Sequence, residues 1–241
     1  MFHQLKAGAQ TGIMLHDIFE KIHFTDDSKW KSTLEEISKK YSAKKKEEIF
    51  PMLEEMLQQV LTHRIKINDV AFKLNEVAFD KRIHEFEFDF PVPAFDPQTL
   101  NLLSDENIKI NVEHREELEG LMNGKIDLFF ECREKYFVLD WKSNFLGASL
   151  DAYSKEKLKD AMNENNYHLQ YLIYTVAVKK YLESRLPDFD YKTDFGGVIY
   201  VFLRGVRSNA DTGIFVCKPP LKTIEKLEKI LGYEVFATLF S

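Results

Sequence analysis

An acid and a base stand two residues apart where an apolar stretch of this sequence ends. Asp140 and Lys142 close the segment "YFVLDWKS", whose first residues are of the kinds that β-strands bury. Because side chains alternate across a strand, both would project from one face of a sheet, about two residue rises apart. The pattern alone is weak, since it recurs at Asp27–Lys29 and Asp190–Lys192. Those two copies lie in polar segments, where a helix start and a solvated loop explain the charges.

A second carboxylate precedes this strand. Asp127 lies in "NGKIDLFF", another apolar run, and a tight turn at Arg133 and Glu134 would set it roughly opposite Asp140. Two carboxylates that meet at the end of a sheet repel each other, and burying either is costly. A hard divalent cation such as Mg²⁺ removes both costs, and it favours carboxylate and main-chain carbonyl ligands. The alternative is a structural ion pair between Lys142 and one or both acids, and spacing alone does not separate the two.

The elements that would hold these residues follow from hydrophobic periodicity. Runs with helical spacing and runs with strand alternation succeed each other along the chain. In chain order we predict helix 11–22, a helical stretch 28–64, strand 82–90 ending at Pro91, strands 118–131 and 135–143, helix 167–185, strand 196–206 and helix 221–239. Within the helical stretch, Pro51 is expected to start a fresh helix. This order predicts an α/β domain in which a mixed sheet lies between helices.

Composition excludes several classes of protein. The 241 residues suffice for one large domain or two small ones, and 44% hydrophobic with 30% charged residues is ordinary for a globular protein. We find no signal peptide and no apolar stretch long enough to cross a bilayer, so we expect no membrane partner. Two cysteines, Cys132 and Cys217, cannot form a disulfide framework, which predicts a cytoplasmic protein with reduced thiols. A formal charge of −6 does not suit nonspecific adhesion to DNA, so any contact with nucleic acid would be local or assisted by a partner.

Four segments together resemble one enzyme family. The stretch "GLMNGKIDLFFECREKYFVLDWKSNFLG" resembles the active-site hairpin of the PD-(D/E)XK nuclease superfamily, and more narrowly that of the RecB-type nuclease domains of exodeoxyribonuclease V. "GIMLHDIFE" is similar to the family's first motif, a helix that carries a histidine. "YHLQYLIYTVAV" is similar to its Gln-x-x-x-Tyr helix, and "DFGGVIYVFLRGV" to the strand that follows. The matches keep the family's order from about Gly12 to Val206, which is most of the chain.

The resemblance implies a restriction-endonuclease-like core of the α/β class, with elements in the order α-β-β-β-α-β. It implies a single nuclease domain over residues 1–241, with a helical insertion at about 28–65. It also implies that the chain is a fragment of a longer helicase–nuclease polypeptide, the beta subunit of an exodeoxyribonuclease V. The implied activity is Mg²⁺-dependent hydrolysis of DNA phosphodiester bonds, in double-strand-break processing and recombinational repair.

The family's site residues carry over to matching positions of this sequence. The resemblance implies that His16, Asp127 and Asp140 are metal ligands, together with the main-chain carbonyl of Trp141. Lys142 would orient or help to deprotonate the attacking water and would stabilise charge on the scissile phosphate. A histidine beside an apolar helical stripe is otherwise usually structural, so the role of His16 depends on the resemblance.

Three further residues are candidates for contact with DNA or for bracing the site. Gln170 and Tyr174 lie one helical turn apart and would sit beside the metal, although a hydrogen bond on the helix surface explains them equally well. Arg204 follows an apolar strand and would meet a phosphate or, alternatively, form a salt bridge. Glu85 and Glu87 share one strand face and could flank the metal, but a solvated face explains that spacing more simply.

The implied cofactor is Mg²⁺, and Mn²⁺ or Ca²⁺ could occupy the same site. We expect no ATP site, because "GLMNGKI" falls one residue short of phosphate-loop spacing and no Ser or Thr follows its lysine. Two cysteines cannot hold the four-cysteine iron–sulfur cluster that some relatives carry.

The implied partners are DNA, the helicase domains of the parent chain, and RecC-like and RecD-like subunits. Two alternatives stay open: a non-catalytic DNA-guiding or subunit-docking module of the same fold, and a stand-alone repair or phage nuclease. Degenerate members of the fold lose the Asp-x-Lys pair or its carboxylate partner. The presence here of all the site residues named above argues against such decay.

Overall fold

A five-stranded sheet forms the centre of the computed structural model, which describes residues 8–41 and 46–232. The strand order is β3-β4-β5-β6-β7; β5 and β6 are parallel, and the other neighbours are antiparallel. The strands are β3 (Arg82–Phe95), β4 (Leu118–Cys132), β5 (Lys135–Lys142), β6 (Phe195–Phe202) and β7 (Ile214–Cys217). A separate antiparallel pair consists of β1 (Ile65–Ile67) and β2 (Val70–Phe72). The predicted α/β class with a mixed sheet is confirmed.

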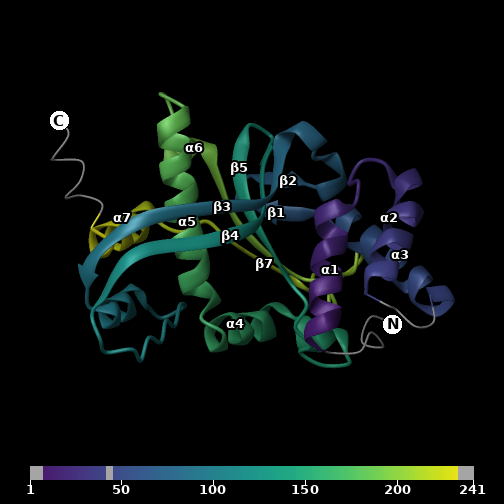
Figure 1. Cartoon of the computed structure of the whole chain (residues 1–241), viewed down its shortest axis with the longest axis horizontal. Helices are drawn as coiled ribbons and strands as arrows, with labels where there is room; N and C mark the ends of the chain where they lie inside the picture. Colours follow the sequence, from purple (N-terminus) through teal and green to yellow (C-terminus); the bar gives the residue numbers. More distant parts are fainter. Residues whose placement is uncertain (1–7, 42–45, 233–241) are drawn as a thin grey trace.

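Helices cover both faces of this sheet (Figure 1). They are α1 (Ala9–Lys21), α2 (Trp30–Lys40), α3 (Lys46–Thr62), α4 (Lys155–Glu164), α5 (Tyr167–Arg185), α6 (Tyr191–Asp194) and α7 (Leu221–Ile230). Short 3₁₀ helices lie at Asp27–Lys29, Leu74–Glu76, Phe79–Lys81, Pro97–Leu103 and Leu150–Tyr153. One hydrophobic core joins α1, α2 and α3 to one face of the sheet, and a second joins α4, α5 and α7 to the other. Among the residues described, no helix has both the length and the apolar character that crossing a bilayer requires.

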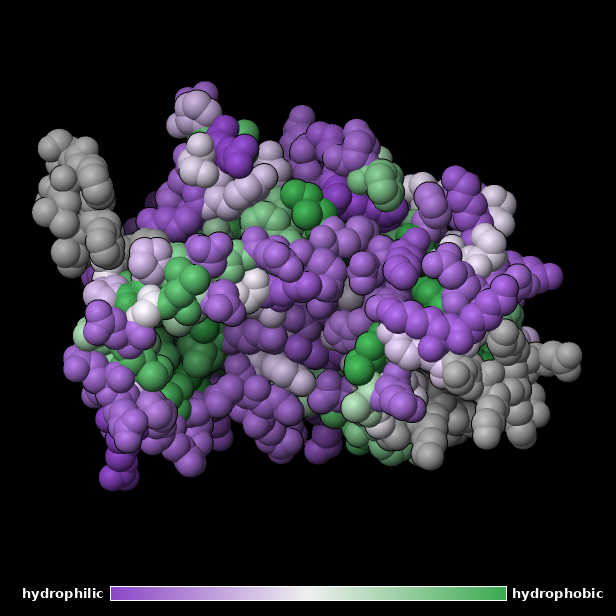
Figure 2. All heavy atoms as spheres, viewed as in Figure 1, coloured by the Kyte–Doolittle hydropathy of each residue, from purple (hydrophilic) through white to green (hydrophobic). Residues whose placement is uncertain are grey.

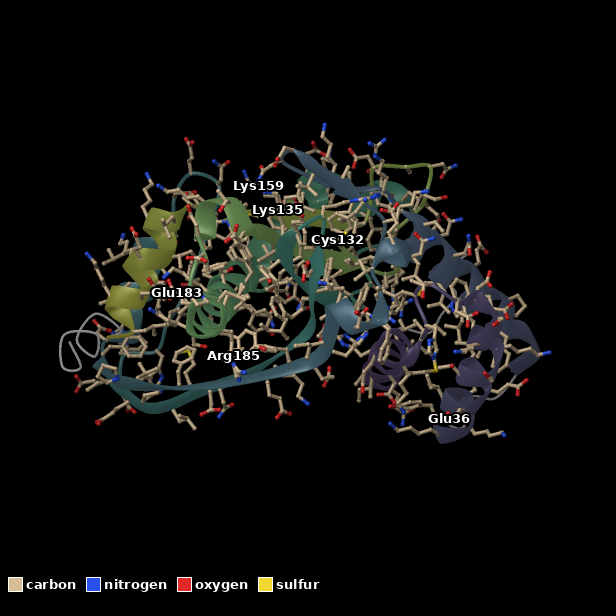
Figure 3. All side chains as sticks on the ribbon, turned by 90° about the horizontal axis from the view of Figure 1, so that it is seen from above. Glu36, Cys132, Lys135, Lys159, Glu183 and Arg185 are labelled. Atoms are coloured by element: carbon tan, nitrogen blue, oxygen red, sulfur yellow. The ribbon has the colours of Figure 1, made fainter. Side chains whose placement is uncertain are left out.

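The turn between β4 and β5 is the two-residue hairpin that the sequence predicts. Cys132 pairs with Lys135, and the intervening Arg133 and Glu134 have φ angles of 52° and 60°. Positive φ at both positions is typical of a type I′ turn, whose twist matches that of antiparallel strands. Figure 3 shows Cys132 and Lys135 close together at this end of the hairpin. The turn therefore fixes which residues of β4 and β5 oppose each other.

Strand β3 extends beyond its predicted end. We expected it to stop at Pro91, but Pro91 pairs with Leu121 and the strand continues to Phe95. Because β3 is an edge strand, a proline nitrogen on its open side removes no ladder hydrogen bond. The predicted end was wrong because the position of a strand in the sheet decides whether proline is tolerated there.

Other boundaries need smaller corrections. Pro51 does not start a helix but lies inside α3, where the packing of the later turns in the core offsets one lost hydrogen bond. Strand β6 ends at Phe202, because the chain turns there and Gly205 N–H bonds back to the Phe202 carbonyl. Helix α7 ends at Ile230, and residues 233–239 of the predicted terminal helix lie outside the described residues. The strands β1, β2 and β7 were missed because three or four residues are too few to show alternation.

Candidate active site

Strands β4 and β5 separate at the residues that the sequence marks for chemistry. Their ladder ends one residue short of Asp127 and Asp140, which thus occupy the next opposing positions, as predicted. From here β4 continues beside β3, and β5 continues beside β6. In place of a ladder bond, Asp127 Oδ2 accepts a hydrogen bond of 2.7 Å from the backbone N–H of Trp141. We call this divergence, with Asp127 on one strand and Asp140 to Lys142 on the other, the strand fork.

Asp140 and Lys142 form a buried ion pair in the fork. Lys142 Nζ lies 2.6 Å from Asp140 Oδ1, and the two residues are 9% and 3% exposed. The pKa of Asp140 is raised to about 6, first by burial and then by the negative charge of Asp127, against the opposing effect of Lys142. Because two carboxylates that raise each other's energy meet here with little of either side chain exposed, additional positive charge at the fork is stabilising.

The Lys142 ammonium group is held by several neighbours besides Asp140. Its Nζ donates to Gln170 Oε1, on α5, at 3.0 Å. It also lies 4.0 Å from the ring centroid of Tyr167 and 5.0 Å from that of Tyr200, within the range of cation–π attraction. An ammonium group enclosed in this way has few other positions available, so its charge is placed before any substrate arrives.

Gln170 links this lysine to α5 and β6. Its Oε1 also accepts a hydrogen bond of 2.9 Å from the Tyr200 hydroxyl, and its Nε2 donates to the Tyr174 hydroxyl at 2.9 Å. The structure therefore brings Gln170 and Tyr174 to the fork, and it adds Tyr167 and Tyr200, which the sequence analysis missed. Tyr167 lies three residues before Gln170, so helical spacing could have found it. Tyr200 carries no local signal, because its position depends on the pairing of β5 with β6.

His16 approaches the fork from α1. Its Nδ1 lies 3.5 Å from Asp127 Oδ1, and its side chain is 37% exposed. Burial acts to lower the pKa of His16, but the hydrogen bond with Asp127 and the charges of Asp127 and Asp140 outweigh it, so the pKa is raised. Helix α1 comes this close because Gly12 packs on the end of β5. A Cβ atom at Gly12 would lie 2.8 Å from Ser143 Oγ.

The oxygen and nitrogen atoms at the fork are of the types that bind divalent cations, but their side chains do not converge as a metal-holding group. Within the described ranges, no three His, Cys, Asp or Glu side chains converge as a group that could hold a metal. One oxygen of Asp140 is paired with Lys142, and one oxygen of Asp127 with the Trp141 N–H. The second oxygens of both acids and the His16 ring are oxygen and nitrogen donors that divalent ions accept. Coordination through the second oxygen of Asp140 leaves its ion pair with Lys142 in place.

Arg204 lies behind the loop that follows β5 rather than in the fork. It is 3% exposed, and its Nε donates to the Ser143 carbonyl at 2.9 Å. Its guanidinium lies 6.0 Å from the ring centroid of Phe145. Of the roles considered above, these contacts favour bracing the site over meeting a phosphate.

A cavity of about 700 Å³ adjoins the fork, and His16 forms part of its wall. Glu85 also lines this cavity, and Glu85 and Glu87 both pair with the partly exposed Lys125, at 3.0 and 3.2 Å. Figure 2 shows that the face of the molecule that carries α1 and β4 is mainly hydrophilic, with hydrophobic side chains gathered near the far ends of β3 and β4. The cavity therefore lies on a polar face, beside the fork.

Comparison with known proteins agrees with this geometry. A family model described as "PD-(D/E)XK nuclease superfamily" matches residues 2–232. The RecBCD enzyme subunit RecB of Haemophilus influenzae is 36% identical over 230 residues, which cover 94% of this chain and 19% of that protein. The RecBCD enzyme subunit RecB of Escherichia coli K12 is 32% identical over 238 residues, which cover 95% of this chain and 20% of that protein. This chain thus spans about one fifth of the length of the curated relatives it matches.

Proposed function

This chain belongs to the PD-(D/E)XK nuclease superfamily, and from that premise we propose that it hydrolyses DNA phosphodiester bonds with the help of a divalent metal ion, Mg²⁺ in the first place. The observation that carries the proposal is the strand fork. There Asp127, Asp140 and Lys142 meet, and Gln170 holds the lysine at 3.0 Å. A purely structural ion pair needs neither a second carboxylate nor the additional hydrogen bond and aromatic contacts of the ammonium group.

Each residue of the fork has a chemical task in this proposal. Asp127, Asp140 and His16 would hold the metal ion, with the main-chain carbonyl of Trp141 as a further ligand. When bound, the ion supplies Lewis acidity and lowers the pKa of a coordinated water. The Lys142 ammonium group stabilises the negative charge that grows on the scissile phosphate, and its neighbours keep it in place at no further cost in ordering.

We further propose that the chain works as the nuclease domain of a longer RecB-like polypeptide. Support comes from the relatives, since 94–95% of this chain aligns with only 19–20% of two RecB subunits. Helicase domains of the same polypeptide, with RecC-like and RecD-like subunits, would then deliver DNA to the fork during double-strand-break processing and recombinational repair in the cytoplasm. A formal charge of −6 is compatible with that arrangement, because other parts of the assembly would hold the DNA.

A cleavage assay tests the proposal. We would incubate linear DNA with the wild-type chain in Mg²⁺ and in EDTA, and compare Asp140→Asn with Asp188→Asn, which alters an exposed carboxylate after α5. Cutting that needs Mg²⁺, is lost in Asp140→Asn and persists in Asp188→Asn is the expected result. Absence of cutting together with absence of metal binding would overturn it and favour a non-catalytic module of the same fold.

A further inference from the structure

Phe145 is an exposed aromatic side chain beside the fork. It lies three residues after Lys142, in the loop that follows β5, and is 47% exposed. Its ring lines the cavity of about 700 Å³ that also contains His16. A volume of this size is in the range of pockets that hold small ligands, so the space beside the ring can take a nucleoside. The ring therefore lies next to the fork with nearly half of its surface open to a binding partner.

The loop that carries Phe145 is fixed on both sides of the ring. The hydroxyl of Tyr153, a buried residue, donates to the Asn144 carbonyl at 3.4 Å and accepts from the Leu146 N–H at 3.2 Å. Arg204 holds the same loop from behind, as described above. Because the residues before and after Phe145 are anchored, its ring is presented with little loss of conformational entropy on binding. Such preorganisation is typical of a binding surface rather than of an incidental exposed residue.

The remaining walls of the cavity indicate which part of a DNA strand would lie there. Ile13, one helical turn before His16 on α1, is 55% exposed and adds a second apolar surface. Asp17, Glu20 and Glu85 also line the cavity, and two of them pair with lysines: Asp17 with Lys40 at 2.6 Å and Glu85 with Lys125 at 3.0 Å. Carboxylates only accept hydrogen bonds and repel phosphate groups, whereas nucleobases are uncharged and carry N–H donors. The cavity thus suits a base and disfavours a phosphate.

We propose that Phe145 is a stacking platform for the nucleobase next to the scissile phosphate, and that it positions the strand so that this phosphate meets Lys142. The proposal rests on the proposed function and deepens it by naming a residue that touches the substrate. Stacking of a base on an aromatic side chain is effective for every base, because each has a flat π face. The platform would therefore contribute affinity and register without sequence preference.

The test compares two strands and four proteins, the wild type and three variants, in the presence of Ca²⁺, which replaces Mg²⁺ so that the DNA stays uncut. Fluorescence anisotropy measures the Kd for an oligodeoxyadenylate and for an abasic oligomer of the same length. Phe145→Leu keeps an apolar side chain but removes the ring, and Phe145→Trp keeps a ring. Phe79→Leu is the matched control, because Phe79 is 70% exposed and does not line the cavity.

We expect Phe145→Leu to weaken binding of the oligodeoxyadenylate about tenfold, which corresponds to ~1.4 kcal/mol, while leaving binding of the abasic strand unchanged. Phe145→Trp and Phe79→Leu should bind both strands as the wild type does. With Mg²⁺ and cleavable DNA, KM should rise more than kcat falls in Phe145→Leu.

Three results would overturn the platform. If Phe145→Leu weakens the binding of both strands equally, the substitution has damaged the loop and has not removed a stacking contact. Unchanged binding of both strands, in a chain that still cuts DNA with Mg²⁺, would refute the platform and leave the nuclease intact. A wild-type chain that neither binds nor cuts DNA in the presence of metal would refute the platform and the proposed function together.

Discussion

The carboxylate of Asp127 accepts a hydrogen bond of 2.7 Å from the backbone N–H of Trp141, the residue that separates the acid from the base on the neighbouring strand. This bond replaces a rung of the ladder at the point where β4 and β5 part. It holds one oxygen of Asp127 against β5 and leaves the other 3.5 Å from His16 Nδ1. One side chain therefore both ends the pairing of two strands and joins α1 to them.

Loss of the ammonium group should remove activity without removing the fold. We expect Lys142→Met to lower kcat for DNA cleavage by about a hundredfold or more, because the charge on the transition state loses a fixed partner. Lys81→Met is the control, since Lys81 is largely exposed and pairs with Glu131, near the hairpin turn. Steady-state cleavage with Mg²⁺ gives the answer, and a kcat within twofold of the wild type in Lys142→Met would contradict the assignment.

Metal binding should stabilise the chain through the fork. At a hundred times its Kd, a ligand that binds only the folded state raises the free energy of unfolding by about 2.7 kcal/mol. We expect thermal unfolding curves to show an Mg²⁺-dependent rise in Tm that is abolished in Asp127→Asn and needs at least about tenfold more metal in His16→Gln. Asp26→Asn should behave as the wild type, because Asp26 caps a short helix far along the chain from these acids and asparagine preserves the cap.

Gln170 should act on catalysis through Lys142. Replacement by methionine removes the amide oxygen that accepts from Lys142 Nζ at 3.0 Å and from the Tyr200 hydroxyl at 2.9 Å. We expect Gln170→Met to lower kcat about tenfold, because the ammonium group gains freedom, and to leave the Kd for DNA in Ca²⁺ within twofold. Gln58→Met, at an exposed position of α3, is the control. A change in Kd with unchanged kcat would instead indicate direct contact with DNA.

A single added methyl group should separate stability from metal affinity. In Gly12→Ala the new Cβ would lie 2.8 Å from Ser143 Oγ, so the Ser143 side chain must rotate or α1 must move, and a movement of α1 carries His16 with it. Alanine at a helical position is more stable than glycine by about 0.5–1 kcal/mol, which opposes the strain of the contact. We expect Mg²⁺ affinity to fall several-fold with little change in Tm. The double variant Gly12→Ala/Ser143→Ala removes the clashing oxygen, and it should recover metal affinity with a Tm above that of the wild type.

A half-buried histidine on β3, His84, should make stability depend on pH. Burial and the neighbouring charge of Arg82 lower the pKa of His84 to about 4, from 6.5 in the unfolded chain. Between pH 6.5 and pH 4 the unfolded state therefore binds the extra proton. The stability contributed by neutral His84 is complete above pH 6.5 and is lost as the pH falls through 4, by at most about 1.4 kcal/mol per pH unit.

His84→Phe isolates this effect, because the ring can keep its edge-to-face packing on Phe24, at 5.6 Å. We expect urea unfolding at pH 7 and pH 5 to give a smaller loss of stability on acidification in His84→Phe than in the wild type. His114→Gln, at an exposed position, should lose as much stability on acidification as the wild type does. The raised pKa of Asp140 acts in the opposite direction in both proteins, so comparing them cancels it. Identical pH profiles in all three would show that His84 is solvated.

Local patterns determined the hairpin and its acids. A two-residue turn at Arg133 and Glu134 sets the register of β4 and β5, and alternation along a strand then places Asp127 opposite Asp140 and puts Asp140 and Lys142 on one face. These are rules of short range, so the sequence alone carries them. The same is true of α5, whose observed limits, Tyr167–Arg185, equal the predicted ones.

Only the tertiary structure decided what surrounds Lys142. Its contact with Gln170 joins residues 28 positions apart, and the hold of Arg204 on Ser143 joins residues 61 apart. Both depend on the parallel pairing of β5 with β6, which follows a crossover through α4 and α5. The position of β3 at the edge of the sheet, which permits Pro91 inside the strand, is of the same kind. Periodicity identifies which face of an element is buried, but long-range packing decides which neighbour that face packs against. At the fork, this packing supplies the neighbours that hold Lys142.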